Sequence, residues 1–288
     1  MKCLFLVNPA AGRNNSYRIW KDIRPHISFP YDFTFTSAPG EATKIAEDAA
    51  RQGFERVVAV GGDGTVSEVV NGIAGKDAEL GIIPAGSGND FVKALNVPQK
   101  PLDALAAIKR GRSQEVDLGR HDGGFFINVA GVGFDAETLH TNRNIKFLRG
   151  SLAYVTSVIL TLVRYSPKNA KITIDGKTYH RKLWLVAVAN GQYFGGGMKI
   201  SPDSKIDDGL FEVCLVNEIS RLEIVRFLPR VFNGGHKEHR AFEVIRGREV
   251  KIDFETPTMV QTDGEIIGLT PVTFSLQPKA LRVIRSEE

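Results

Sequence analysis

A glycine-rich segment with an acid at its centre follows the short apolar run at residues 57–60. The segment 61–65 reads GGDGT and leads into a helical pattern. Glycines between a strand and a helix let backbone N–H groups approach an anion, and the N-terminus of the helix adds favourable partial charge. Asp63 would repel a phosphate unless a divalent cation or a proton to be abstracted lies between them, so the segment predicts phosphoryl transfer. A plain tight turn would need neither Asp63 nor Thr65.

A second glycine-rich turn follows the apolar run that ends at Pro84. Gly86, Ser87 and Gly88 offer backbone and hydroxyl donors, while the next two residues, asparagine and aspartate, offer oxygens that suit Mg²⁺ or its waters. A helix cap at either residue is the plain structural alternative. Two phosphate-sized turns at successive strand ends predict one site.

Acids also stand at two turns in the second half of the chain. Asp263 and Glu265 follow a strand-like run and lie two residues apart across a glycine. A carboxylate there can accept the proton of a hydroxyl as a phosphoryl group moves, and a second can orient it. Asp63, Asp263 and Glu265 are therefore competing candidates for the base, with an Asp-Gly hairpin turn as the plain alternative. The Asp-Asp-Gly sequence at 207–209 offers hard oxygen ligands for Mg²⁺, or simply a β-turn.

The elements that must position these residues change in kind near residue 117. Before it, short apolar runs alternate with helical patterns, which is typical of a parallel α/β layer. A helix is predicted over 41–52, ended by Gly53. After it, strand-like runs dominate, with an Asp175-Gly176 hairpin signal and helical patterns near 151–165 and 220–232. We predict two domains, a parallel α/β domain at 1–117 and a mainly antiparallel β-sandwich at 118–288. Whether the final run LRVIR returns to the first domain stays open.

The 288 residues, 42% apolar and 24% charged, are typical of a globular protein with two cores that share a cleft, which suits an enzyme with two substrates. The first apolar run is too short for a signal peptide, and the longest, at 152–163, is shorter than the roughly 20 residues of a spanning helix. The sequence therefore predicts a cytoplasmic protein. Cys3 and Cys214 lack metal-ligand spacing and are expected to be buried thiols.

The net charge is +4, and its distribution is uneven. Between residues 139 and 182 there are nine Lys or Arg against the single acid Asp175, which predicts either contact with anionic lipid headgroups or a face whose charges are solvated or paired. The segment 220–232 interleaves apolar residues with three arginines and is typical of an interfacial amphipathic helix, which Pro229 would kink. We expect peripheral association with the inner face of the membrane, and no nucleic acid partner.

Five motifs in chain order resemble those of the bacterial diacylglycerol kinase-like lipid kinases. They are VNPAAG from residue 7, GGDGT from 61, PAGSGNDF from 84, SKIDDGLF from 204 and DGE from 263. GGDGT is shared with sphingosine kinases, NAD kinases and phosphofructokinases, whereas PAGSGNDF is similar to the lipid-kinase branch. The resemblance covers nearly the whole chain. It implies a Rossmann-like first domain related to those of phosphofructokinase and NAD kinase, and ATP-dependent transfer to a lipid hydroxyl, with diacylglycerol as the first candidate acceptor.

The resemblance also implies roles for particular residues. Glu265 becomes the expected base, with Asp263 and Asp63 as competitors, and a structural Mg²⁺ is expected on Asp208 and the carbonyls of Lys205 and Leu210. The expected ATP and Mg²⁺ contacts are Asn8, Pro9, Ala10, Ala11, Gly12, Thr36, Gly62, Asp63, Gly64, Thr65, Val66, Ser67, Glu68, Ser87, Asn89 and Asp90.

Two other functions stay open. One is a kinase of another acceptor, such as phosphatidylglycerol, a sphingoid base or NAD. The other is a catalytically idle, nucleotide-binding regulatory protein, against which the acids at positions 63, 90, 208 and 265 argue because an idle site needs none of them. A homodimer is a further possibility that the sequence does not decide.

Overall fold

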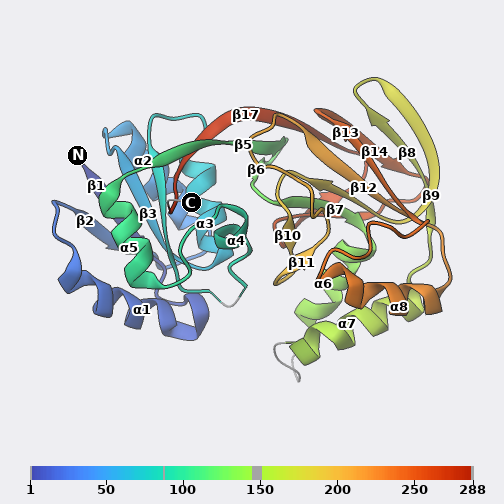
Figure 1. Ribbon diagram of the computed structural model, residues 1–288, viewed down its shortest axis with the longest axis horizontal. Helices are drawn as coiled ribbons and strands as arrows, with labels where there is room; N and C mark the ends of the chain where they lie inside the picture. The colour runs from blue at the N-terminus through green and yellow to red at the C-terminus, as the bar shows by residue number, and fades with distance from the viewer. Residues whose placement is uncertain (1, 87, 145–150, 287–288) are drawn as a thin grey trace.

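A computed structural model describes residues 2–86, 88–144 and 151–286. Figure 1 shows two lobes side by side, each with its own set of strands, joined at the top by β5 (Ser113–His121) and β17 (Val272–Ile284). The first lobe contains β1 (Cys3–Val7), α1 (Ala11–Ile23), a 3-10 turn (Arg24–His26), β2 (Asp32–Phe35), α2 (Glu41–Arg51), β3 (Arg56–Gly61), α3 (Asp63–Ile73), β4 (Glu79–Pro84), α4 (Asp90–Ala94) and α5 (Pro101–Arg110).

The strands of the first lobe are parallel in the order β2-β1-β3-β4. Val57 and Ala59 of β3 pack with α2 and α3 on one face, while Val58 and Val60 pack with α1 and α5 on the other. Both faces of the sheet are therefore covered, which is why its central strands are continuous apolar runs. The predicted parallel α/β layer is confirmed.

The second lobe is mainly antiparallel, as predicted. Its elements are β5 (Ser113–His121), β6 (Gly124–Phe126), β7 (Val129–Gly133), α6 (Phe134–Asn144), α7 (Ser151–Arg164), β8 (Lys168–Ile174), β9 (Lys177–Ala189), β10 (Tyr193–Phe194), β11 (Met198–Lys199), β12 (Phe211–Asn217), α8 (Arg221–Val231), β13 (Phe242–Gly247), β14 (Glu249–Phe254), β15 (Met259–Thr262), β16 (Glu265–Leu269) and β17 (Val272–Ile284). Asp175 (φ 46°) and Gly176 (φ 82°) form the predicted hairpin turn between β8 and β9.

The two lobes share one hydrogen-bonded sheet. β17 pairs with β14 and β5 in the second lobe, and its end runs parallel to β4, with Arg282 opposite Glu79. The final run therefore does return to the first lobe, a point that the sequence left open. The predicted division after Asp117 falls inside β5. Asp117 is buried there and accepts the N–H groups of Gly209 and Lys279, both at 2.8 Å.

The helices α6, α7 and α8 lie together along one side of the second lobe, at the lower right of Figure 1. α8 begins with a capping box between Ser220 and Glu223, which satisfies orphan N–H groups of the first turn. In the described part of the chain, no helix combines the length and the apolar character needed to cross a membrane.

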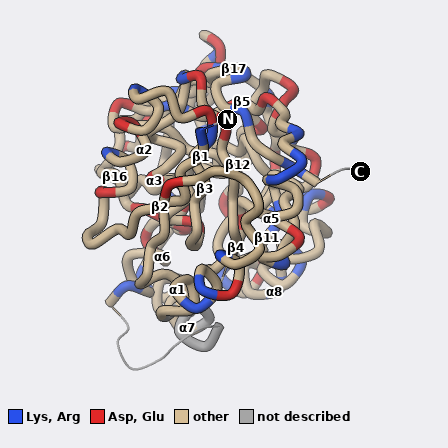
Figure 2. The backbone as a smooth tube through the Cα atoms, turned by 90° about the vertical axis from the view of Figure 1, so that its left-hand side faces the viewer, with Lys and Arg blue, Asp and Glu red and all other residues tan. Residues whose placement is uncertain are grey.

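Figure 2 shows the backbone from the side of the first lobe. In this view Lys and Arg are interspersed with Asp and Glu and do not gather in one basic patch. Two members of the basic run pair with acids from distant segments, Arg181 with Glu243 at 3.1 Å and Lys182 with Glu218 at 2.8 Å. For these two residues, the predicted alternative of charges paired within the fold is confirmed. Cys3 and Cys214 are buried, as predicted, and burial raises the pKa of each thiol to about 12.

Candidate active site

Three loops meet at the carboxyl ends of β1, β3 and β4. The side-chain amide of Asn8 donates to Thr65 Oγ1 at 3.0 Å, which ties the first loop to the GGDGT turn. Gly12 has φ +58°, and a Cβ there would lie 2.0 Å from the carbonyl oxygen of Ala85. A Cβ on Gly62 would lie 3.0 Å from Gly86 Cα. The loops therefore approach one another at distances that only glycine allows.

The other residues expected to contact nucleotide lie around these loops in different settings. Thr36 is buried and donates its N–H to the carbonyl of Val7 at 2.9 Å. Val66 belongs to the core, and Glu68 Oε2 accepts the N–H of Ala42, so both side chains support the fold locally. The remaining members are half-buried or exposed at the loops, namely Pro9, Ala10, Ala11, Gly64 and Ser67. Ser87 lies outside the described residues.

The carboxylates of Asp63 and Asp90 lie close to each other beside the glycine-rich loops. Asp63 Oδ1 accepts the N–H of Phe91 at 3.1 Å, and burial, together with the nearby charge of Asp90, raises the pKa of Asp63. Asp90 Oδ2 accepts the N–H of Gly196 at 2.7 Å, which links α4 to the loop between β10 and β11 in the second lobe. Its Oδ1 lies 3.3 Å from Lys93 Nζ.

Asp263 reaches this point from the turn between β15 and β16. Its carboxylate accepts the N–H groups of Ile127 at 2.7 Å, Asn128 at 3.0 Å and Val129 at 3.1 Å. Burial raises the pKa of Asp263 to about 7 against the lowering effect of these bonds, and the charge of Asp63 adds to the rise. Acids far apart in the sequence are thus electrostatic neighbours.

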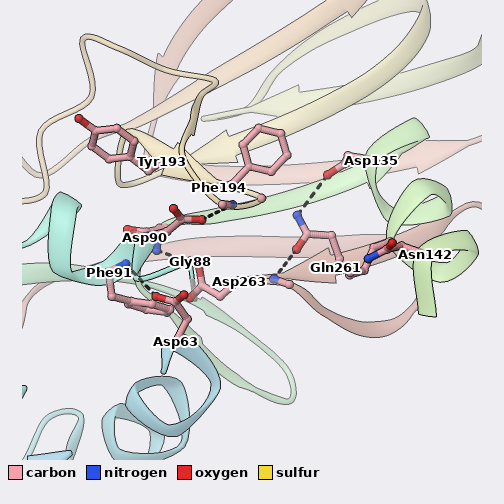
Figure 3. Close-up of a pocket in the computed structure, with 15 residues that line it drawn as sticks. Asp63, Gly88, Asp90, Phe91, Asp135, Asn142, Tyr193, Phe194, Gln261 and Asp263 are labelled. Atoms are coloured by element: carbon pink, nitrogen blue, oxygen red, sulfur yellow. Dashed lines mark hydrogen bonds between the residues drawn. The ribbon is translucent and has the colours of Figure 1, made fainter. Parts of the chain in front are cut away.

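A cavity of about 220 Å³ lies between the two lobes at these carboxylates. In Figure 3, Asp63, Asp90 and Asp263 gather at one end, and Asp135 and Asn142 lie at the other. Its walls are Asp63, Gly88, Asp90 and Phe91 from the first lobe, and Asn128, Asp135, Leu139, Asn142, Tyr193, Phe194, Gly195, Gly196, Gln261, Asp263 and Gly264 from the second. The predicted cleft between the lobes is therefore present, with acids from both.

Glu265 lies beside this cavity rather than in its wall. It is the first residue of β16 and is exposed, whereas Asp263 and Gly264 line the cavity. The turn is held from α6, because Arg143 Nη2 donates to the carbonyl of Gly264 at 3.0 Å. Of the three candidate bases, the structure brings Asp63 and Asp263 together and places Glu265 at the rim.

The second-lobe wall of the cavity contains residues that the sequence did not predict, among them Gln261 and Asp135. Gln261 donates to Asp135 Oδ2 at 3.1 Å and accepts the N–H of Gly264 at 2.8 Å, so it connects α6 to the Asp263 turn. A signal was available for Asp135: an apolar strand ends in Gly133 (φ +108°), and the acid stands in the first turn of the next helix. This is the same strand, glycine and acid order as at Asp63.

The residues at the loops fit a Mg²⁺ that is bound together with a nucleotide. Across the described ranges, no three acidic, histidine or cysteine side chains converge closely enough to hold a metal ion by themselves. Mg²⁺ commonly takes one or two carboxylates and completes its shell with phosphate oxygens and water. Asp63 and Asp90 supply such carboxylates, and the buried Oδ1 of Asn89 has no hydrogen-bond partner within the described part of the chain.

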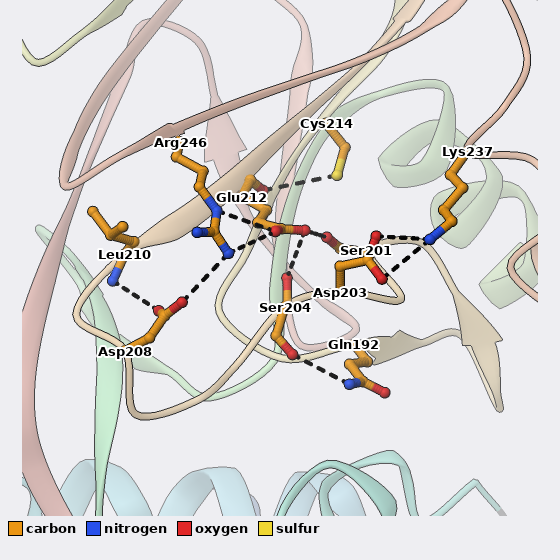
Figure 4. A network of polar contacts seen from close by, with 10 residues as sticks. All are labelled: Gln192, Ser201, Asp203, Ser204, Asp208, Leu210, Glu212, Cys214, Lys237 and Arg246. Carbon is orange, nitrogen blue, oxygen red and sulfur yellow. Dashed lines mark hydrogen bonds and ion pairs between the residues drawn. The ribbon is translucent and has the colours of Figure 1, made fainter.

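In the turn at 205–210, where a second Mg²⁺ was expected, the Asp208 carboxylate already makes two contacts within the fold. Asp208 Oδ1 accepts the N–H of Leu210 at 3.1 Å, and Oδ2 lies 3.5 Å from Arg246 Nη2 (Figure 4). The same arginine binds the buried Glu212 at 3.1 Å. An ion on Asp208 and the carbonyls of Lys205 and Leu210 would compete with this guanidinium. The metal site there stays a prediction.

Comparisons with known proteins agree with this architecture. Residues 2–121 match the diacylglycerol kinase catalytic domain, and residues 128–285 match the YegS C-terminal NAD kinase beta sandwich-like domain. The chain is 32% identical to a diacylglycerol kinase of Bacillus subtilis (strain 168) over 257 residues, which cover 88% of this chain and 85% of that protein. It is 32% identical to a diacylglycerol kinase of Staphylococcus aureus (strain Newman), covering 83% and 77%.

Solved structures from Bacillus anthracis (strain Sterne) are also similar. A diacylglycerol kinase superposes with a TM-score of 0.78 at 26% identity, covering 99% of this chain and 97% of that one. A second structure from the same strain gives a TM-score of 0.84 at 28% identity, covering 99% and 95%. The chain therefore belongs to the diacylglycerol kinase family, whose members are lipid kinases. It is an enzyme of that class, with the two-domain architecture of the family.

Proposed function

We propose that this enzyme transfers the γ-phosphoryl group of ATP to a lipid hydroxyl, with diacylglycerol as acceptor and phosphatidic acid as product. The observation that carries the proposal is the meeting of Asp63, Asp90 and Asp263 in one cavity between a glycine-rich loop cluster and the second lobe. Relatives at 32% identity that are named diacylglycerol kinase support this choice of acceptor.

ATP lies across the loops at the carboxyl ends of β1, β3 and β4 in this proposal. Backbone N–H groups of the glycine-rich turns bind its phosphates, and Asp63 and Asp90 would hold a Mg²⁺, which would neutralise part of the phosphate charge. The lipid oxygen then forms a bond to the γ-phosphorus as the bond to the β,γ-bridging oxygen breaks, so that ADP leaves. When both substrates fill the cavity, they leave little room for water, which would otherwise hydrolyse ATP.

Glu265 accepts the proton of the lipid hydroxyl in this proposal. The Asp263 carboxylate accepts three N–H groups, from residues 127–129, and Asp63 accepts the N–H of Phe91. Both carboxylates therefore have a positioning role in this proposal. Glu265 is exposed at the rim of the cavity, on the lobe that would carry the acceptor. A general base must reach the proton that it removes, and an acceptor bound at the rim would meet this side chain.

Peripheral contact with the membrane is proposed through α7 and α8. Their outer sides expose large apolar side chains, with Val163 69%, Leu222 60% and Val225 52% exposed. Arg226 and Arg230 stand on the same side of α8 and suit anionic headgroups. This face would rest on the inner surface of the membrane, where the acceptor resides.

Transfer of labelled γ-phosphate from ATP with Mg²⁺ tests the proposed function. The acceptors are diacylglycerol, phosphatidylglycerol and a sphingoid base in mixed micelles, with NAD as a soluble acceptor. Labelled phosphatidic acid is the expected product. Labelling of another lipid would replace the proposed acceptor, and labelling of NAD alone would contradict lipid kinase activity in this chain. Nucleotide binding with no labelled product would favour the idle regulatory protein.

A further inference from the structure

The turn at 205–210 is fastened to the strands that connect the two lobes. The N–H of Asp117 in β5 donates to the carbonyl of Ile206 at 2.7 Å, and Asp117 Oδ2 accepts the N–H of Gly209 at 2.8 Å. The other oxygen of the same carboxylate accepts the N–H of Lys279 in β17 at 2.8 Å. The conformation of this turn therefore bears on the place where β5 and β17 pass between the lobes.

Two arginines from the end of β13 bind the same turn. Arg246 Nη2 lies 3.5 Å from Asp208 Oδ2, and Arg248 Nε donates to the carbonyl of Gly209 at 3.1 Å. The strand register explains the position of the first one, because Arg246 stands directly opposite Glu212 in the pairing of β12 with β13. The chain itself thus brings positive charge to the turn.

The first of these arginines also neutralises a buried acid. Glu212 is buried, and its Oε1 accepts Arg246 Nη2 at 3.1 Å and Nε at 3.3 Å. Its Oε2 accepts the hydroxyl groups of Ser201 and Ser204 (Figure 4). A buried carboxylate without a positive partner is strongly destabilising. One guanidinium therefore balances two acids, Glu212 in the interior and Asp208 at the turn.

A Mg²⁺ fits poorly beside these groups. The ion needs near-octahedral oxygen ligands at about 2.0–2.1 Å. Of the oxygens at the turn, Asp208 Oδ1 accepts the N–H of Leu210, Oδ2 faces Arg246, and the carbonyl of Gly209 is bound by Arg248. Within the described ranges, no third acidic, histidine or cysteine side chain joins the two acids to form a metal site. An ion here would also meet the like charge of two guanidinium groups.

We propose that the guanidinium of Arg246 takes the place of a metal ion at this turn, so that the turn keeps its conformation without Mg²⁺. Arg246 is then a positioning residue. It fixes Asp208 and Glu212 and, through the turn, supports the contacts of Asp117 with β17. The Mg²⁺ proposed to accompany ATP at the other end of the cleft is unaffected.

Thermal unfolding without nucleotide tests this role, in EDTA and in Mg²⁺ at equal ionic strength. Wild type and Asp208→Asn should respond to Mg²⁺ equally, within about 1 °C, because neither holds an ion at the turn. Arg246→Met should unfold at least about 5 °C lower in EDTA, since two carboxylates lose their counter-charge. Mg²⁺ should then restore at least about 2 °C, because the freed carboxylates attract a divalent cation.

Arg248→Met is the matched control. It removes an arginine from the same turn, but one that binds a carbonyl rather than a carboxylate. Its unfolding temperature should fall by less than that of Arg246→Met, and its response to Mg²⁺ should equal that of wild type. The comparison of wild type with Asp208→Asn remains decisive even where Arg246→Met fails to fold.

A rise in the unfolding temperature of the wild type with Mg²⁺ that Asp208→Asn abolishes would put an ion on Asp208 and overturn the proposal. A wild-type unfolding temperature of Arg246→Met in EDTA, or a loss in that variant that Mg²⁺ does not reduce, would overturn it as well. None of these measurements needs kinase activity. The role of Arg246 and the proposed function can therefore fail separately.

Discussion

The Asp263 side chain fixes the backbone of a neighbouring segment through hydrogen bonds. One side chain accepts three consecutive N–H groups, from Ile127, Asn128 and Val129, and so fixes the entry to β7 against the turn before β16. Glu265, two residues later, is exposed. Two acids of one short motif therefore lie in different surroundings, which their spacing alone could not predict.

Substitution of the two acids is predicted to fail in different ways. Asp263→Ala leaves buried donors without an acceptor, at about 1–3 kcal/mol for each, and should lower the unfolding free energy markedly. Glu265→Gln should leave stability within about 0.5 kcal/mol of wild type and lower kcat by about 10²–10⁴, with ATP affinity unchanged. Denaturant unfolding and steady-state rates measure the two effects. A fully active Glu265→Gln enzyme would remove Glu265 from the role of base.

Asp135 gives the free energy of unfolding a distinct pH dependence. Burial raises its pKa from 3.8 to about 6 in the folded protein. Below about pH 3.8 the Asp135 carboxyl is protonated in both the folded and the unfolded state, so its burial as a charged group does not lower the free energy of unfolding. Between these values only the unfolded chain loses the proton, so the contribution of Asp135 to stability falls as pH rises, and above about 6 the loss is constant.

Asp135→Asn should therefore stabilise the protein only at higher pH. Relative to wild type, the variant should gain little near pH 4 and at most about 3 kcal/mol above pH 6, because each pKa unit corresponds to about 1.4 kcal/mol. Denaturant unfolding of both proteins from pH 4 to 8 gives the difference directly. A difference that does not change with pH would mean that Asp135 keeps an ordinary pKa in the fold.

At the scale of elements, the first lobe could be predicted because its signals are local. Apolar runs that end in glycine and an acid determine strand, loop and helix within about ten residues, and parallel strands bring such loops to one edge. The wall formed by Asp135, Asn142 and Gln261 was missed because it depends on the pairing of β7 with β15, which lie more than a hundred residues apart.

The loop after β1 is predicted to tolerate no side chain at Gly12. Gly12→Ala and Gly53→Ala both place alanine at positive φ, but only at position 12 would the Cβ meet a backbone carbonyl, that of Ala85. ATP affinity should fall at least about tenfold in the first variant, because the loops that we propose bind phosphate would move apart, and stay near wild type in the second. Calorimetric titration with ATP compares them. Equal affinities would show that the loop packing does not support the nucleotide site.

The outer face of α7 and α8 should control binding to vesicles. Val163→Asp with Leu222→Asp adds two charges to this face and should reduce sedimentation with anionic vesicles several-fold, since it opposes both apolar and electrostatic contact. Val244→Asp is the control, because Val244 is 42% exposed on β13 and lies outside the two helices. Equal loss in both variants would count against a specific docking face.

At the scale of the whole molecule, β17 joins the two lobes in one sheet. It pairs with β14 and β5 and then, after a bulge near Leu281, runs beside β4. The sequence indicated two kinds of domain but not this shared strand, because a parallel pairing between residues 79 and 282 leaves no local signal. Asp117 of β5 accepts N–H groups from positions 209 and 279 and so ties β5 to β17 near the point where β17 passes between the lobes. This contact helps to fix the relative position of the lobes, whose acids meet in the cavity.

The rate of diacylglycerol phosphorylation by Asp63→Asn shows whether phosphoryl transfer depends on the carboxylates between the lobes, as we propose. The measurement is kcat in mixed micelles at saturating ATP and Mg²⁺, with unfolding temperature and ATP binding measured on the same preparation. A loss of at least about a hundredfold in a folded protein that still binds ATP is predicted. A wild-type rate in that variant would show that the transfer does not depend on Asp63 and takes place elsewhere.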